Sequence, residues 1–412
     1  MNSFTQQFFV GNRRRLRAAL PSGALVALTA NGTLQRSADT TFPFCQDRNF
    51  WYLTGINDAD VVFVMTSDDE YLIVPKTSAT KDVFDGALDM SMMTRISGIG
   101  TVLEYRHGWR RLKSDLQTHK SVYTISVGAS YHSGYNFFLN PARKRLAGRL
   151  RRARPGLVTN DIREHLTKLR VVKQPEELEA IRQAVNITTE SFSQIRSSSM
   201  LASYGYEYEL EADLTRAFRT AGADGHAYEP IVAAGKNATT LHYTQNSSPL
   251  AKNELIVVDA GAEYIGYAAD ITRTISARKP SARQQAIHDA VVTVQAEAQR
   301  LLKPGVLLRE YEHEVVQKMA RSLKELGLIN SVNNFEGVRR YYPHATSHFL
   351  GLDVHDVGFY EHPLAENMVL TCEPGIYIPE EGIGVRIEDD LVITASGNEN
   401  LSEHCPYDAY LL

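Results

Sequence analysis

The stretch ELIVVDAGAEYIGYAADITRTI, residues 254–275, contains two apolar segments with a tyrosine- and glycine-containing centre between them. Apolar segments rich in β-branched residues on either side of a turn predict an antiparallel hairpin. We place the centre of the turn at residues 264–265, next to Gly266. In this register Asp259 faces Asp270 across the two strands, with side chains on one face and Cβ atoms about 5 Å apart.

A second stretch, MVLTCEPGIYIPEEGIGVRIEDDLVIT, residues 368–394, predicts another hairpin of the same kind. The PEEG segment supplies the turn. Pairing about this turn sets Glu373 opposite Glu388. The same register sets Arg386 against Gly375, on the same strand face as Glu388, because side chains alternate along a strand.

Two pairs of like charges directly opposite each other are destabilising, so both hairpins need an explanation. The acids could be solvated on an exposed face, each pair could share a proton, or all four could hold cations. We favour cations, because the acids lie within apolar strands where unpaired charge is costly. The stretch HATSHFLGLDVHDVG, residues 344–358, adds histidines. Four carboxylates with one histidine suit manganese first, then cobalt or zinc. Bridging carboxylates favour two ions about 3.5–4 Å apart, which generate a hydroxide and polarise a carbonyl.

The bulk composition excludes several classes of protein. The 412 residues predict two or three domains, and 43% hydrophobic with 22% charged residues is typical of globular proteins. A net charge of −4 argues against a general nucleic-acid partner. The sequence contains no run of 18 apolar residues that would predict a membrane span, and its first residues do not resemble a secretory signal. Three scattered cysteines, Cys45, Cys372 and Cys405, form neither a disulfide framework nor a zinc pattern, which predicts a cytoplasmic location.

The chain changes character near residues 155–175. Before this break, GALVALTA and DVVFVMTSDDEYLIVP predict strands, the second interrupted by a turn. After it, KQPEELEAIRQA has a proline at the first helical position and acids in the first turn, which is typical of a helix start. We therefore expect a mixed α/β domain over residues 1–165 and a second domain over residues 170–412. Further helices are predicted at 207–221, 281–302 and 309–326.

A basic run, RKRLAGRLRRAR, covers residues 143–154 and contains seven basic residues and no acid. Such a run could bind nucleic acid. A solvated helix face or a subunit contact explains it better, because runs of charge are usually exposed.

Several of these motifs resemble a known family. The segments HYTQN, VVDAGAEYIGYAADITRT, HATSHFLGLDVHDVG, EPGIY and GVRIEDD together resemble aminopeptidase P and its relatives, the dinuclear-metal peptidases of the pita-bread fold, which include prolidase. The segments QRSAD, FWYLTG and KQPEELEAIRQA resemble the N-terminal domain and domain junction of bacterial aminopeptidase P. The resemblance covers nearly the whole chain. It implies an α+β protein in which an N-terminal mixed α/β domain is followed by a pita-bread catalytic domain.

The resemblance also implies roles for the metal ligands. Asp259 would bind one metal ion and Asp270 would bridge two ions. His348 would be the nitrogen ligand, and Glu388 a second bridge. Glu373 would bind one ion and accept the proton of the nucleophile.

Three more histidines match positions that line the substrate pocket in relatives: His242, His344 and His355. His355 would stabilise the tetrahedral intermediate, and His344 would lie near the scissile bond. Alternatively, these imidazoles only orient ligands and never touch substrate.

A polar network around the metals is implied for Tyr377 and Arg386. In tetramers of the family an aspartate from a neighbouring subunit joins this network, and Asp39 of QRSAD matches it. Phe84 stands where the bacterial enzyme has a tryptophan that caps the substrate. This departure leaves the subunit assembly, dimer or tetramer, open.

We therefore expect hydrolysis of the bond between an N-terminal residue and a following proline. The alternative is a prolidase, which takes only dipeptides and needs a cation for their free carboxylate. The expected position for that cation, residues 356–372, has no arginine or lysine and only His362. Arg339 or Arg340 could supply it from another direction. A non-catalytic binding protein is a third alternative, disfavoured because all five metal positions are filled.

Overall fold

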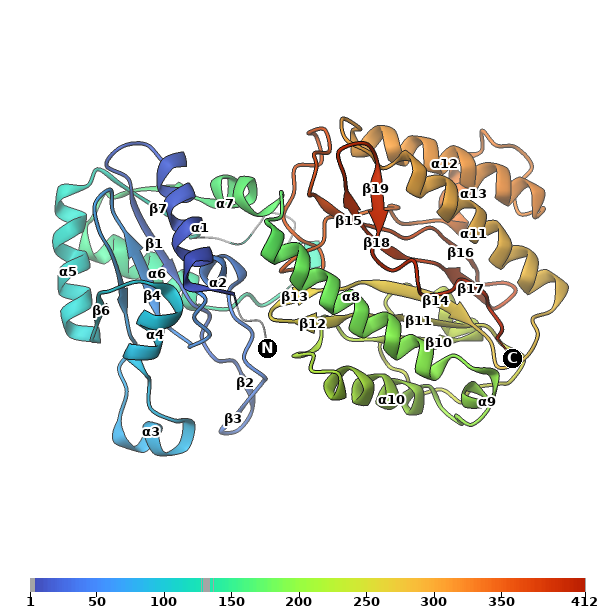
Figure 1. Cartoon of the computed structure of the whole chain (residues 1–412), viewed down its shortest axis with the longest axis horizontal. Coiled ribbons are helices and arrows are strands. Elements are labelled where there is room, and N and C mark those ends of the chain that lie inside the picture. Colours follow the sequence, from blue (N-terminus) through green and yellow to red (C-terminus); the bar gives the residue numbers. More distant parts are fainter. Residues whose placement is uncertain (1–3, 127, 129–133, 136, 412) are drawn as a thin grey trace. The chain divides into compact units, whose positions relative to one another are not determined.

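The computed structural model describes residues 4–126, 128, 134–135 and 137–411, and the chain divides into two compact units, Met1–Leu169 and Arg170–Leu412. Each unit combines helices with strands (Figure 1). None of the helices in the described part of the chain has the length and apolar character needed to cross a membrane.

The first unit is built on a six-stranded sheet in the order β6-β5-β4-β1-β7-β8. All its strands run in parallel except β4, which pairs antiparallel with β1 and β5. The predicted strands in GALVALTA and in DVVFVMTSDDEYLIVP are confirmed as β1, β4 and β5. The strands span Leu25–Thr29 (β1), Val62–Met65 (β4), Glu70–Ile73 (β5), Val102–Leu103 (β6), Ser121–Thr124 (β7) and Val158–Asp161 (β8).

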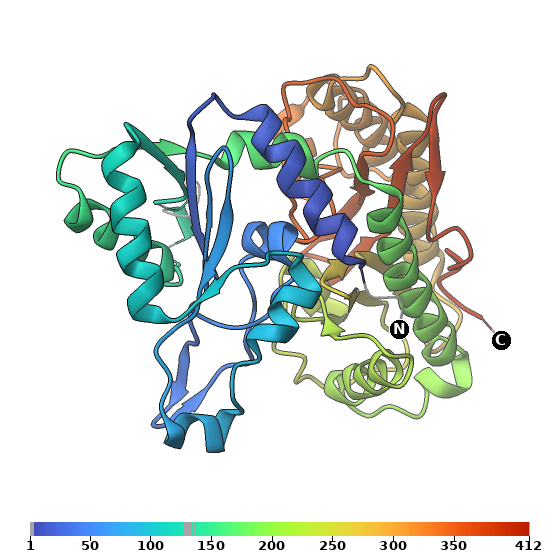
Figure 2. The ribbon, with the colours of Figure 1, turned by 60° about the vertical axis from the view of Figure 1, so that its left-hand side comes forward.

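Helices lie on both sides of this sheet, as Figure 2 shows with α1 on one side and α5 on the other. Leu112 of α5 and Leu146 of α6 pack in one apolar core with Leu25 and Val62 of the sheet. The first unit also holds a short hairpin of β2 and β3. The bounds are Gln6–Ala19 (α1), Arg48–Thr54 (α2), Ala79–Asp85 (α3), Met90–Ser97 (α4), Tyr105–Thr118 (α5), Ala142–Ala153 (α6), Arg163–Arg170 (α7), Gln35–Ser37 (β2) and Thr40–Thr41 (β3).

The basic run at 143–154 forms α6, but its arginines are not all solvated. Arg143 donates to Asp47, Arg145 to Asp60, and Arg149 to the Tyr105 hydroxyl. Arg154 donates to backbone carbonyl oxygens of the same unit. Arg145 is exposed, as a solvated helix face predicts, whereas Arg143, Arg149 and Arg154 are half-buried against their partners.

The second unit begins with the predicted helix α8 (Pro175–Ile195), which has proline at its start and a capping box made by Gln174 and Glu177. The other predicted helices are confirmed as α10 (Glu207–Thr220), α11 (Ala282–Leu301) and α12 (Leu308–Glu325). Shorter helical segments are α9 (Ser198–Leu201), η2 (Gly235–Thr239) and α13 (Phe335–Tyr341).

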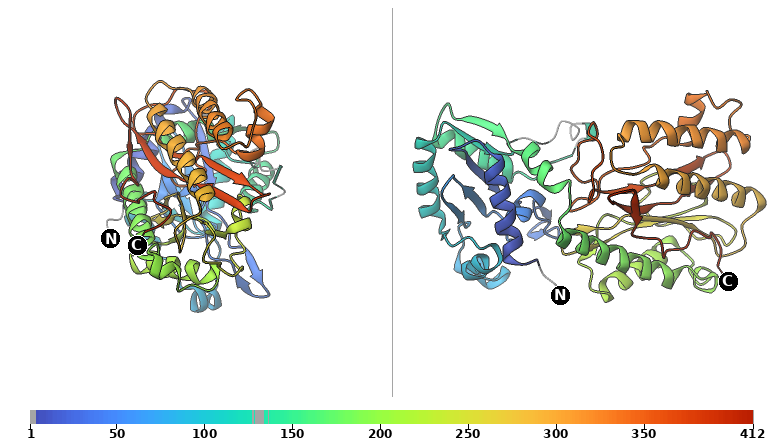
Figure 3. Two further views of the ribbon diagram at one scale, coloured as in Figure 1. Left: turned by 90° about the vertical axis from the view of Figure 1, so that its right-hand side faces the viewer. Right: turned by 45° about the horizontal axis from the view of Figure 1, so that its top comes forward.

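Its helices cover two groups of strands, visible in both views of Figure 3. Helices α8 and α10 pack on the sheet β10-β11-β14, and α11 and α12 pack on β15 to β18. The strands span Gly225–His226 (β9), Ile231–Ala234 (β10), Ile256–Ala260 (β11), Ala262–Tyr264 (β12), Tyr267–Ala268 (β13), Ile271–Ile275 (β14), Val369–Cys372 (β15), Gly375–Ile378 (β16), Ile383–Arg386 (β17), Asp389–Ile393 (β18) and Asn398–Asn400 (β19).

The first hairpin forms in a register different from the predicted one. Tyr264 pairs with Tyr267, so the turn is Ile265–Gly266, whose φ angles are 49° and 79°. Asp259 therefore pairs with Thr272, not with Asp270. The turn is displaced by one residue, which moves each partner by two positions and leaves the side chains on the same face. The two aspartates become diagonal neighbours on that face.

The second hairpin has the predicted register. Gly375 pairs with Arg386 in β16 and β17, and Cys372 pairs with Asp389 in β15 and β18. Glu373 and Glu388 lie between these two paired segments. The PEEG segment forms the turn between Ile378 and Ile383.

Candidate metal and substrate site

Strand alternation places the acids on the face that the helices leave free. In β11, Val258 and Ala260 pack into the core beneath α8 and α10, so Asp259 points to the opposite face. In the second hairpin, Cys372 and Ile387 enter the core beneath α11 and α12. Their neighbours Glu373 and Glu388 therefore point away from that core.

Three side chains from separate segments converge on this face. Asp270, His348 and Glu388 each offer a ligand atom, and these atoms all lie within 4.8 Å of one another. His348 Nε2 lies 3.4 Å from Asp270 Oδ2 and 3.6 Å from Glu373 Oε1. The other ring nitrogen, Nδ1, lies 3.1 Å from the Phe349 carbonyl oxygen and donates to it. This tautomer leaves Nε2 as the ligand atom.

Asp259 joins the cluster through two side chains. Arg386 Nη2 donates to Asp259 Oδ2 at 2.5 Å. The Tyr228 hydroxyl lies 2.5 Å from Asp259 Oδ1 and 2.6 Å from Asp270 Oδ1, so it bridges the two carboxylates. The sequence analysis missed Tyr228. It stands alone in HAYEP, and no spacing rule connects it to aspartates more than 30 residues away.

The cluster carries more negative than positive charge. Burial raises the pKa of Asp259, raises that of Glu373 to about 7, and raises that of Glu388 far above its usual range. Burial alone would lower the pKa of His348, but the hydrogen bond to Asp270 and the charge of Glu373 raise it to about 9. Among the described residues, the basic side chains within ion-pair distance of these four carboxylates are Arg386, His348 and His344, and His344 is uncharged at pH 7 because its pKa is lowered to about 3. Divalent cations fit this excess, because they would allow all four acids to ionise.

A hydrogen-bonded chain runs from Arg386 to His344. Arg386 Nη1 donates to the Tyr377 hydroxyl oxygen at 3.1 Å, and that hydroxyl lies 2.9 Å from His344 Nε2. His344 Nδ1 lies 2.8 Å from the Ala345 carbonyl oxygen and donates to it, so Nε2 accepts from Tyr377. Burial and the Arg386 charge lower the pKa of His344 to about 3. His344 is therefore neutral at pH 7.

The Arg386 side chain also reaches Glu388. Its Nε donates to the Thr272 hydroxyl oxygen at 3.2 Å, and that hydroxyl donates to Glu388 Oε2 at 2.6 Å. One arginine therefore orients both Asp259 and Glu388. Thr272 occupies this position because the observed register sets it opposite Asp259.

The other two predicted histidines lie at the exposed side of the cluster. The ring of His355 is 4.3 Å from that of His348, centroid to centroid, and its side chain is exposed. Burial of part of the ring, then the charge of His348, lower its pKa to about 4. His242 is exposed in the segment after η2, and its charge contributes to the lowered pKa of both His344 and His355.

Two predicted residues belong to the first unit. Asp39 is exposed between β2 and β3, and Phe84 of α3 has 83% of its surface exposed. The residues Asp270, His348 and Glu388 of the cluster all belong to the second unit.

The loop that carries His348 and His355 is anchored by a buried ion pair that the sequence analysis missed. Asp356 accepts from Arg170 Nη2 at 2.5 Å and from Lys173 Nζ at 2.8 Å, and all three side chains are at most 2% exposed. Asp353 of the same loop also accepts from Arg170, but it is 43% exposed. The anchoring fixes the loop beside the cluster.

Comparison with known proteins decides the family. The model of metallopeptidase family M24 matches residues 179–395, and the model of the aminopeptidase P N-terminal domain matches residues 9–123. The chain belongs to metallopeptidase family M24. Xaa-Pro aminopeptidase of Escherichia coli is 33% identical over 98% of this chain and 96% of its own length. Human Xaa-Pro aminopeptidase 3 is 30% identical over 92% of this chain and 78% of its own length.

Solved structures agree with this assignment. Aminopeptidase P from E. coli, in its low-pH form, has a TM-score of 0.88 at 31% identity and covers 99% of this chain and 97% of its own. A variant of the E. coli enzyme in complex with substrate has a TM-score of 0.85 at 32% identity, over the same shares of the two chains. The expected architecture, an N-terminal α/β domain followed by the pita-bread catalytic domain, is confirmed. This M24 member is a divalent-metal peptidase.

Proposed function

We propose that this M24 member releases the N-terminal residue from peptides that have proline in second position. The observation that carries the proposal is the cluster that His348 forms with four carboxylates. The negative charge of these carboxylates exceeds the positive charge of the side chains around them. The Xaa-Pro aminopeptidases that match nearly the whole chain support the same reaction.

The ligand set fits two divalent ions, with manganese first and cobalt or zinc as alternatives. Asp259 and Asp270 of the first hairpin, His348, and Glu373 and Glu388 of the second would hold them. Asp270 and Glu388 are proposed as the bridging ligands. When bound, the metals supply a nucleophile at neutral pH and polarise the scissile carbonyl.

The protein's own groups then divide the remaining work. Glu373 accepts the proton of the attacking water, because its carboxylate lies between His348 and His344 at the exposed side of the cluster. His355 donates a hydrogen bond to the oxygen on which charge develops, through the N–H of its neutral ring. His344 and His242 contact the substrate beside the scissile bond. Tyr377 holds His344 in position.

The same fold could serve a prolidase, but the surroundings of the site do not favour it. The two arginines that could clamp a dipeptide carboxylate have other partners. Arg339 donates to the His344 carbonyl oxygen and to Glu312, both at 3.0 Å. Arg340 forms an ion pair with Glu380. His362 lies stacked on Phe359. Longer peptides should therefore enter.

Cleavage of a short peptide panel tests the proposal. The manganese-loaded protein is mixed with Xaa-Pro dipeptides, Xaa-Pro-Xaa tripeptides and matched peptides with alanine for proline, and mass spectrometry identifies the products. We expect release of the first residue only before proline, with tripeptides cleaved at least as well as dipeptides. A strict preference for dipeptides that disappears in Arg339→Gln or Arg340→Gln would instead establish a prolidase.

The assembly and location belong to this proposal as well. Phe84 and Asp39 are both exposed in the first unit, as an interface between subunits of a dimer or tetramer would require. Cys45, Cys372 and Cys405 are all free thiols, which suits the reducing cytoplasm.

A further inference from the structure

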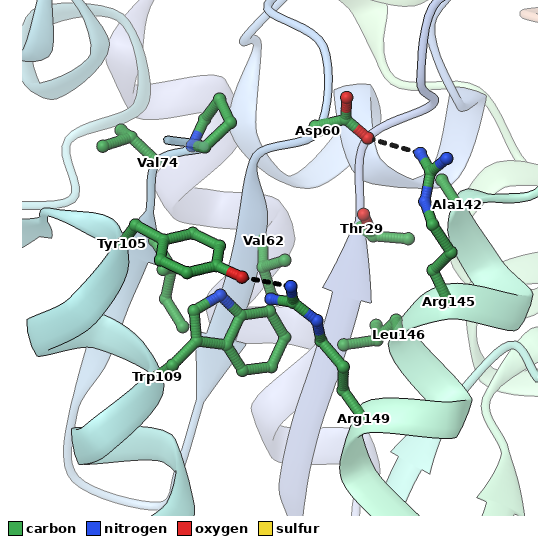
Figure 4. A pocket seen from close by; sticks show the side chains of 12 residues that line it. Thr29, Asp60, Val62, Val74, Tyr105, Trp109, Ala142, Arg145, Leu146 and Arg149 are labelled. Atoms are coloured by element: carbon green, nitrogen blue, oxygen red, sulfur yellow. Dashed lines mark hydrogen bonds and ion pairs between the residues drawn. The ribbon is translucent and has the colours of Figure 1, made fainter. Parts of the chain in front are cut away.

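The first unit contains a pocket whose features the peptidase reaction does not explain. Its volume is about 260 Å³, and it lies between α5, α6 and the ends of three central strands (Figure 4). Tyr105 and Trp109 of α5 form one wall, and Leu146 and Arg149 of α6 form the other. The volume is close to the lower limit for small-ligand sites, which suits a compact molecule.

Arg149 is the unusual residue of this pocket. Its guanidinium lies over the ring of Trp109, 4.4 Å from the centroid, and over that of Tyr105 at 5.0 Å. It donates to the Tyr105 hydroxyl. Among the residues that the structure describes, no carboxylate lies within ion-pair distance of Arg149. Its charge is therefore held by neutral partners and is available to an anion.

The rest of the lining defines the neutral part of the ligand. A second cation at the rim, Arg145, pairs with Asp60 at 2.7 Å, so the pocket keeps one net positive charge. Val62, Val74 and Leu146 supply apolar surface. One uncompensated cation beside apolar and aromatic walls fits a monoanion with an apolar or aromatic body.

The position in the fold supports a ligand site independently. Thr29 ends β1, and Ile73 ends β5; both line the pocket. These two strands run parallel to each other, on either side of antiparallel β4. In open α/β sheets, ligands bind outside the carboxyl ends of the parallel strands, near the point where the order of connections changes.

From these observations we infer that the first unit binds a small arylalkyl or alkyl carboxylate, with the carboxylate on the Arg149 guanidinium and the apolar body against Trp109 and Leu146. The inference does not depend on the peptidase reaction, since all the residues that carry it belong to the first unit.

Fluorescence of Trp109 tests the inference in the full chain. The chain has two tryptophans, so Trp51→Phe leaves Trp109 as the reporter. The probe is 3-phenylpropionate, and its neutral amide is the matched control ligand. We expect saturable fluorescence change with a Kd of about 1 mM for the acid, in the range of weak small-ligand binding. The amide should bind at least about tenfold more weakly, because it lacks the charge that Arg149 pairs with.

Two substitutions on the same helix distinguish binding in the pocket from a general effect of positive charge on that helix. Arg149→Gln should weaken binding of the acid by about tenfold or more, and Arg149→Lys should recover part of it. Arg152→Gln removes the same charge from an exposed position outside the pocket and should leave the Kd within about twofold. Unchanged peptidase activity and thermal unfolding show that each variant is folded.

Three results would overturn the inference. The first is the absence of any saturable signal from the acid. The second is equal weakening by Arg149→Gln and Arg152→Gln, and the third is unchanged binding in Arg149→Gln. In the last two cases the acid would bind elsewhere on the chain.

Discussion

Removing the carboxylate of Asp356 should destabilise the second unit more than any change at its surface. In Asp356→Asn, the buried cations Arg170 and Lys173 lose the charge that neutralises them. Breaking a buried ion pair by removing one partner costs about 3–5 kcal/mol. The second unit spans residues 170–412, a size for which 1 kcal/mol corresponds to about 2–4 °C in Tm. We therefore expect Tm to fall by about 6–20 °C.

Asp353→Asn is the matched control. It removes a carboxylate that lies on the same loop and pairs with the same Arg170, but Asp353 is 43% exposed. Exposed ion pairs contribute about 0–1 kcal/mol, so Tm should fall by no more than about 4 °C. Thermal unfolding followed by circular dichroism measures both variants. Equal, small shifts in the two variants would refute the assignment of Asp356 as the anchor of this loop.

The same ion pair predicts a dependence on pH. Burial alone would raise the pKa of Asp356, but Arg170 and Lys173 hold it below its usual value. A carboxylate with a lowered folded-state pKa contributes stability above its unfolded pKa of about 3.9 and loses it as the pH falls through the folded value. The unfolding curves of the wild type and Asp356→Asn should therefore converge below about pH 4. A constant difference down to pH 2 would contradict the charge as the cause.

Two further changes test the site. His355→Ala should lower kcat by about 10²–10³ with metal content unchanged, because one donor to the developing oxyanion is lost; loss of metal measured by mass spectrometry would show that His355 is a ligand instead. Gly261→Ala should destabilise the chain by about 1–3 kcal/mol or more, because its Cβ would lie 1.7 Å from the Ala269 carbonyl oxygen, next to the segment that carries Asp270. Wild-type stability and metal content in this variant would mean that the hairpin tolerates the shift.

Local signals account for what the sequence predicts correctly. The PEEG turn fixes the second hairpin, and with it the positions of Glu373, Glu388 and Arg386. The predicted register of the first hairpin is wrong because the turn puts Ile265 at a φ of 49°, a conformation that β-branched residues rarely adopt. Because each partner moves by two positions, side chains stay on the same face of the strands, and the predicted face of Asp259 is correct.

Long-range contacts account for what the sequence does not predict. Tyr228 reaches two aspartates through the folding of β9 beside β12, and Arg170 meets Asp356 across 186 residues. Each of these residues is ordinary in its local sequence, and only the tertiary structure gives it a partner. The roles of Phe84 and Asp39, in contrast, are implied by the family resemblance alone.

Metal titration of the metal-free protein tests the central claim most directly. Calorimetry counts the bound Mn²⁺, and cleavage of one Xaa-Pro tripeptide is followed in the same samples. We predict two ions per chain, with activity appearing as the site fills, and the loss of at least one ion in Glu388→Ala. Full activity in the metal-free protein, or two ions bound as tightly in Glu388→Ala as in the wild type, would contradict the account.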